Sequence, residues 1–140
     1  MQWRLHAVVA LSVAALLTGC GSGIDTATVR GKVTLGGQPV PNVIVNFQPE
    51  NGRPAVGQTD ASGNYELSTI SSGDGAVPGM HKVSFSIKTE PPPSTAVAKQ
   101  MSGPVVAAPF NVKYRSGETS GLTREVKAGE SNVFDFELEK

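Results

Sequence analysis

The stretch VRGKVTLGGQPVPNVIVNF, residues 29–47, decides the fold class. Apolar and polar residues alternate in residues 29–35 and again in residues 43–48. A period of two is typical of a strand that buries one face. Gly36 and Gly37 separate the two runs and supply the backbone freedom of a tight turn. The stretch therefore predicts two half-buried strands with a turn between them.

Similar runs recur along the rest of the chain. Residues 81–88 give the clearest one, because Val83, Phe85 and Ile87 share one face and polar residues fill the other. Besides residues 81–88, the predicted strands in this part of the chain are residues 56–59, 64–68, 122–126 and 133–138. No segment after the first twenty residues has a convincing helical period, and turn residues separate the runs. We expect an all-β fold, a single antiparallel β-sandwich of about seven strands. The side chains expected to face its core are Phe47, Tyr65, Val83, Phe85, Phe134 and Phe136.

The segment Asp60-Ala-Ser-Gly63 is predicted to be a tight turn. Asp60 can accept backbone N–H groups inside the turn, and Gly63 can take a positive φ. The alternative is a calcium loop, but a hard cation prefers six or more oxygens and acidic residues are sparse here. We therefore expect a plain turn, after which Tyr65 and Leu67 point inward together.

The first twenty residues have the three parts of a secretory signal. Arg4 is followed by an apolar run over residues 7–17, which is too short to cross a bilayer. Residues 17–20, Leu-Thr-Gly-Cys, then resemble the lipobox of bacterial lipoproteins. The resemblance implies a helical signal peptide over residues 1–19, cleavage between Gly19 and Cys20, and a lipid on Cys20 that anchors the protein to a membrane.

Residues 20–27 would then form a short tether, and residues 28–140 one β-sandwich domain. Without residues 1–19 the chain has eleven Lys and Arg against twelve Asp and Glu, a net charge of −1. Because no basic stripe or charge block is present, we expect no nucleic-acid partner. Cys20 is the only cysteine, so a lipidated chain can form no disulfide and depends on its packed core.

Two segments together resemble the carboxypeptidase regulatory-like domain, a transthyretin-like sandwich. The first is residues 29–47, and the second is residues 59–67, TDASGNYEL, which is similar to the family pattern T-D-x-x-G-x-Y-x-L. Residues 79–85 are similar to a further strand of that family, with His81 where an aromatic residue is usual. The resemblance implies the sandwich fold and a non-catalytic accessory role, and it implies no peptidase activity.

Candidate catalytic residues are few. His81 is the only histidine after residue 19, and at the start of a strand it is expected to be a surface or edge residue. Tyr114-Arg-Ser-Gly117 looks similar to the terminal Tyr-Arg-Gly-Ser of hydroxyisourate hydrolase, but the order differs and a second histidine is missing. Tyr65, Tyr114 and one histidine also fall short of the iron ligands of intradiol dioxygenases. We expect no enzyme activity, no cofactor and no metal.

Residues 89–109 lack the alternation of apolar and polar residues that marks the predicted strands. They hold five of the ten prolines, and Pro91–Pro93 is interpreted as a stiff spacer rather than a polyproline ligand. Long loops of this kind are usually functional or disordered. The apolar residues of the loop, which either cover the sandwich or bind a partner, are Val97, Met101, Val105 and Val106.

The hypothesis favoured by these patterns is a cell-envelope lipoprotein, a non-catalytic structural or interaction module held at a membrane by Cys20. Gly21 stands where some inner-membrane lipoproteins carry Asp, which favours the outer membrane. Its partner would be another envelope protein or a glycan. The alternative is a lipoprotein that binds a glycan or peptide through residues 89–109.

Overall fold

The computed structural model describes residues 23–88 and 107–140, and the elements named below lie in these two ranges. One short 3-10 helix, η2, spans Val112–Arg115. The strands are β1 Val29–Leu35, β2 Gln38–Pro39, β3 Val43–Pro49, β4 Ala55–Gln58, β5 Asn64–Glu66, β6 Gly79–Ile87, β7 Thr123–Val126, β8 Asn132–Val133 and β9 Phe136–Leu138.

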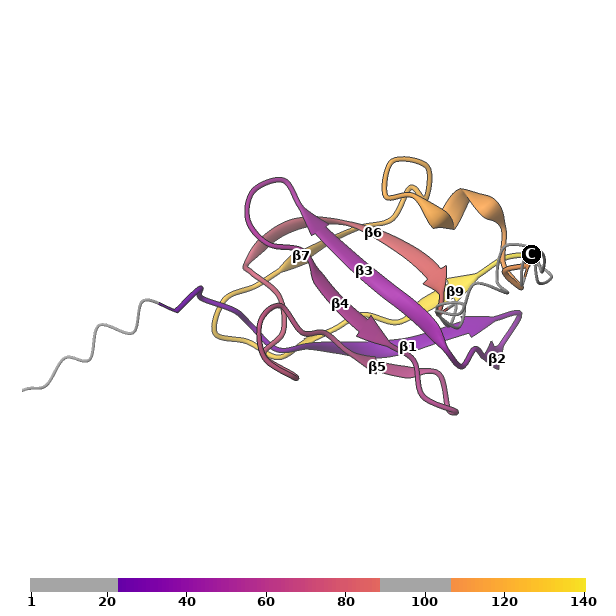
Figure 1. Ribbon diagram of the computed structural model, residues 1–140, viewed down its shortest axis with the longest axis horizontal. Coiled ribbons are helices and arrows are strands. Elements are labelled where there is room, and N and C mark those ends of the chain that lie inside the picture. The colour runs from indigo at the N-terminus through magenta and orange to yellow at the C-terminus, as the bar shows by residue number, and fades with distance from the viewer. Residues whose placement is uncertain (1–22, 89–106) are drawn as a thin grey trace, which may run out of the picture.

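The strands form two sheets that pack face to face as an all-β sandwich (Figure 1). In the first sheet β1 is central. It pairs antiparallel with β2 and β5, and parallel with β8 and β9. The second sheet has the order β4-β3-β6-β7 and is antiparallel throughout. A bridge between Val56 and Ser68 joins the two sheets along one side.

The expected strands are all present, and their number and pairing differ from expectation in three ways. The described residues hold nine strands rather than about seven, because β2 is an additional two-residue strand after the Gly36-Gly37 turn. The predicted strand over residues 133–138 is broken into β8 and β9. Both of these pair parallel with β1, so the sandwich is not wholly antiparallel.

The break between β8 and β9 has a local cause in two residues, Asp135 and Gly31. Asp135 Oδ1 accepts the backbone N–H of Lys32 at 2.9 Å, where a regular ladder would use a backbone carbonyl. On the facing residue of β1, a Cβ added to Gly31 would lie 1.8 Å from the carbonyl oxygen of Phe134. Only glycine therefore permits this close approach of the two backbones.

The strand directions divide the loops between the two ends of the sandwich. We call one end the tether end, defined as residues 23–28 and the loops 50–54, 67–78 and 127–131. The chain enters the sandwich at this end, and the C-terminus lies at the opposite end (Figure 1). The opposite end also carries the Gly36-Gly37 turn and the Asp60–Gly63 turn.

The core is built around aromatic rings from both sheets. Phe47 of β3 and Phe85 of β6 are fully buried, and both rings pack on Phe136 of β9, with ring centroids 6.1 and 5.2 Å apart. Five of the six residues expected in the core are buried. Phe134 is half-buried and stacks on Phe47, with centroids 6.0 Å apart.

Replacing Phe85 with Ala is expected to lower the free energy of unfolding by about 3–5 kcal/mol, because a buried ring leaves a cavity. Phe85 packs edge-on against Phe110, Tyr114 and Phe136, so its loss weakens the contact between β6 and three other segments. Chemical denaturation of the two proteins measures the difference. Val112→Ala is the control, because Val112 is exposed and should change little. Equal effects of the two substitutions would contradict this packing.

Candidate functional site

The predicted lipidation and cleavage residues, Gly19 and Cys20, lie outside the described residues, and so does most of the 89–109 loop. Among the described residues, Ala27 is the first whose backbone is hydrogen-bonded into the fold. Its N–H donates to the carbonyl of Ala76 at 2.8 Å, and the N–H of Ala76 donates back at 3.0 Å. Within the described ranges no helix has the length and apolar character needed to span a membrane.

The Asp60–Gly63 segment is the predicted turn. Asp60 Oδ1 accepts the backbone N–H groups of Ser62 at 2.8 Å and Asn64 at 2.9 Å, and Gly63 has a φ of 78°. Tyr65 and Leu67 are both buried, as expected. In residues 23–88 and 107–140 no group of three or more His, Cys, Asp and Glu side chains is placed to hold a metal ion.

His81 is not a surface or edge residue, and that expectation is wrong. Its strand β6 lies between β3 and β7, and its side chain is fully buried. The Nε2–H group donates to the carbonyl of Val77 at 2.7 Å, and the ring lies 5.7 Å from the ring of Phe47. Nδ1 has no hydrogen-bond partner in the described structure. His81 thus occupies an aromatic core position two residues before Val83 on the same face of β6.

Tyr114 and Arg115, which belong to the 114–117 segment, lie in different environments. Tyr114 is buried and packs against Phe85 and Phe110. Arg115 is exposed at the end of η2. The segment therefore contributes an aromatic ring to the core and a charge to the surface.

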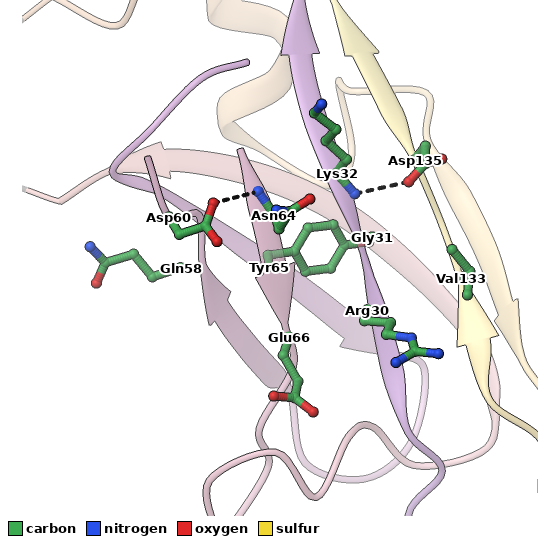
Figure 2. A pocket seen from close by; sticks show the side chains of 10 residues that line it. All are labelled: Arg30, Gly31, Lys32, Gln58, Asp60, Asn64, Tyr65, Glu66, Val133 and Asp135. Atoms are coloured by element: carbon green, nitrogen blue, oxygen red, sulfur yellow. Dashed lines mark hydrogen bonds between the residues drawn. The ribbon is translucent and has the colours of Figure 1, made fainter. Parts of the chain in front are cut away.

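A hollow on the outer face of the first sheet was not expected from the sequence. It is an open pocket of about 680 Å³ across β5, β1 and β8 (Figure 2). Five of its ten lining residues carry a formal charge. The lining residues are Arg30, Gly31, Lys32, Gln58, Asp60, Asn64, Tyr65, Glu66, Val133 and Asp135.

Strand register explains why charged groups gather in this pocket. Arg30 lies opposite Glu66, and Lys32 lies opposite Asn64, with all four side chains on the outer face. The intervening pair, Gly31 and Tyr65, faces the core. Opposite charges on directly opposed strand residues attract each other weakly at an exposed surface.

Tyr65 forms the base of the pocket because Gly31 has no side chain to displace its ring. The ring extends from β5 toward β1 (Figure 2). Its hydroxyl donates to the carbonyl of Phe134 at 2.7 Å. Burial raises the pKa of Tyr65 far above its ordinary value, and the nearby Asp135 carboxylate raises it further. Tyr65 is therefore a neutral hydrogen-bond donor that fixes the break between β8 and β9.

The charged groups of the pocket fall into two kinds. The carboxylates of Asp60 and Asp135 accept hydrogen bonds from backbone N–H groups, and these bonds fix the positions of both side chains. Among the described residues, the side chains of Arg30, Lys32 and Glu66 take part in no ion pair. The pocket thus offers two cations and one carboxylate at fixed strand positions, an arrangement suited to polar groups of either charge and to hydroxyls.

The pocket could not be predicted from the sequence because it depends on the register in which β1 pairs with β5. Alternation identifies Arg30 and Lys32 as outward residues of one strand, and Asn64 and Glu66 as outward residues of another. It does not say which strands are neighbours or which residues face each other. The missed signal is a pair of strands with charged outward residues around one inward glycine.

No known protein family, no curated protein and no solved structure matches this chain. The geometry of the described residues therefore carries the functional argument.

Removing the Asp60 carboxylate is expected to make stability less sensitive to acid. The backbone N–H of Asn64 above all, with that of Ser62, lowers the pKa of Asp60 from its ordinary value of 3.8. A carboxylate with a lowered folded-state pKa stabilises the fold fully above its ordinary pKa, and this contribution is lost as the pH falls through the folded-state pKa. The difference in Tm between the unchanged protein and Asp60→Ala should thus be constant above about pH 5 and shrink below pH 4.

Thermal unfolding between pH 2 and 7 measures this difference. Glu130→Ala is the control, since the Glu130 carboxylate makes no hydrogen bond in the described structure. A Tm difference for Asp60→Ala that grows toward acid pH would contradict the turn geometry.

Proposed function

We propose that this protein is a lipid-anchored lipoprotein of the bacterial cell envelope, and that its sandwich is a non-catalytic interaction module. The observation that carries the proposal is the position of Ala27. It is the seventh residue after Cys20, and it is already hydrogen-bonded into the fold through Ala76. The chain between these residues spans at most about 25 Å. A lipid on Cys20 would therefore hold the whole domain close to a membrane surface.

Lipid chemistry makes Cys20 a sufficient anchor. Each buried methylene adds about 0.8 kcal/mol to membrane affinity, so two or more acyl chains on one residue give stable attachment. The Leu-Thr-Gly-Cys motif of residues 17–20 supports this role for Cys20, and Gly21 supports the outer membrane as its destination.

Replacing Cys20 with Ser is expected to abolish incorporation of labelled palmitate and to release the protein from the membrane fraction. Serine lacks the thiol that accepts the lipid, while the sandwich, which begins seven residues later, should keep its Tm. Metabolic labelling and membrane fractionation measure both effects. Palmitate incorporation that persists in the variant would overturn the anchor. Ser22→Ala, a substitution beside the motif, is the control and should label normally.

Binding of a glycan or peptide is the second candidate function, and the pocket on β1 and β5 favours it. Arg30, Lys32 and Glu66 are available there for a ligand that carries charges or hydroxyls. The pocket lies on the side of the sandwich and not at the tether end, so an anchored domain would leave it accessible. This second candidate uses described strands, whereas the sequence alone directed the binding site to residues 89–109.

A photoreactive amino acid in place of Lys32 is expected to capture a specific envelope component in intact cells, and the same substitution at Arg115 is not. Both positions are exposed and basic, but only Lys32 lines the pocket. Adding Arg30→Ala should reduce capture at position 32 several-fold, because it removes a neighbouring cation. Mass spectrometry of the cross-linked species gives the partner.

A loop variant separates the pocket from residues 89–109. In it, a short Gly-Ser link joins Lys88 to Phe110. Capture at position 32 that survives this change assigns binding to the pocket. Capture that is lost while the Tm is kept assigns binding to the loop instead.

A further inference from the structure

Most of the exposed apolar side chains of the described structure lie at the tether end or near the start of strands that begin there. Six large hydrophobic residues are exposed in residues 23–88 and 107–140. Ile24 lies in the chain that enters the sandwich, and Ile70 lies in the 67–78 loop. Three more are the second residues of strands that begin at this end, namely Val56 of β4, Met80 of β6 and Val133 of β8. Only Val112 lies at the opposite end.

The exposure of Ile70 is fixed by the backbone around it. The carboxylate of Asp74 accepts three successive N–H groups, those of Thr69 at 2.6 Å, Ile70 at 2.9 Å and Ser71 at 2.8 Å. These bonds lower the pKa of Asp74 and close residues 69–74 into a compact turn. The Ile70 side chain is nevertheless 59% exposed. The turn therefore holds an isoleucine side chain at the surface on a fixed backbone.

Met80 is presented in a similar way from the second sheet. Its backbone is part of β6 and lies opposite Glu125 of β7, while its side chain is 49% exposed. Beside it is a shallow hollow of about 230 Å³ lined by two prolines, Pro49 and Pro78, among other residues. Ile70 and Met80 thus stand on ordered backbone at the end where the chain enters.

The length of chain between Cys20 and Ala27 limits how far this end can lie from a lipid on Cys20. Ala76, in the same loop as Ile70, is hydrogen-bonded to Ala27, and Cys20 lies only seven residues earlier. We propose that the tether end rests on the bilayer interface, with Ile70 and Met80 in the interfacial layer and Ile24 beside them. This inference rests on the proposed lipid anchor.

The charges at the tether end indicate which kind of bilayer it fits. Its described residues carry four acidic and two basic side chains, namely Asp25, Glu50, Asp74 and Glu130 against Arg53 and Lys127. A net negative end gains nothing from anionic lipids, unlike a basic membrane-binding face. The contact is therefore apolar, and it fits a zwitterionic lipid surface at physiological salt.

Contact with the bilayer would also fix the orientation of the domain. An anchor on a flexible tether by itself leaves a domain free to tumble near the surface. Apolar contacts from both sheets at one end would set the strands upright on the membrane. The pocket on β1 and β5 would then face sideways, parallel to the membrane plane.

Site-directed fluorescence tests the contact in the full-length acylated protein. Cys20 is the only cysteine and would carry the lipid, so a second cysteine is the only thiol available for labelling. Ile70→Cys, Met80→Cys and Val112→Cys are each labelled with an environment-sensitive nitrobenzoxadiazole dye and reconstituted into phosphatidylcholine vesicles. Val112 is the matched control, because it is apolar and 71% exposed at the opposite end.

The emission of the dye at positions 70 and 80 is expected to shift to shorter wavelength and to be quenched by spin-labelled lipids, whereas the dye at position 112 changes in neither respect. Adding phosphatidylserine should not increase the shift. Equal spectra at all three positions on vesicle-bound protein would overturn the contact and leave the anchor intact. A shift that needs anionic lipid, or that grows with protein density, would also overturn it. Absence of palmitate on Cys20 would overturn the anchor and the contact together.

Discussion

The pairing of β1 on both of its edges is the constraint on which the structure depends. β1 is the first long strand, yet its partners include β8 and β9 near the end of the chain, about a hundred residues later. Gly31 makes this possible, since any side chain there would collide with the carbonyl of Phe134. The last strands can then lie close enough to bring Phe136 and Leu138 into the core, where both are buried.

The same close approach produces the polar pocket on the other face of the sheet. Because Gly31 leaves space, the ring of Tyr65 lies across β1 and ties its hydroxyl to Phe134. The displaced backbone leaves the N–H of Lys32 without a carbonyl partner, and the Asp135 side chain takes that place. One glycine thus links the packing of the core to the arrangement of charge outside. A binding role for the pocket would therefore be coupled to the stability of the β8 and β9 pairing.

The two ends of the sandwich differ in their exposed side chains, and this difference is consistent with the proposed anchor at one end. Most exposed apolar residues lie at the tether end or near the start of strands that begin there, and the turn that carries Ile70 is held by hydrogen bonds from backbone N–H groups to the Asp74 carboxylate. The opposite end has η2 and the exposed ion pair of Lys113 with Glu139. Exposed ion pairs of this type add little to stability, and they suit a surface that faces water. A domain with such ends can combine attachment at one end with recognition on its side.

The sequence by itself determined the secondary structure class, most strand positions and the Asp60–Gly63 turn. These depend on local rules. A period of two buries one face of a strand, and an aspartate with a glycine three residues later closes a turn. Only the tertiary structure decided the parallel pairing of β8 and β9 with β1, the break at Asp135, the burial of His81 and the pocket. Alternation fixes which face of a strand is apolar, but the partner of each edge depends on contacts between residues distant in the chain. His81 shows the limit most directly. Its position at the start of a predicted strand indicated a surface or edge residue, and its neighbours in space, Phe47 and Val77, made it part of the core.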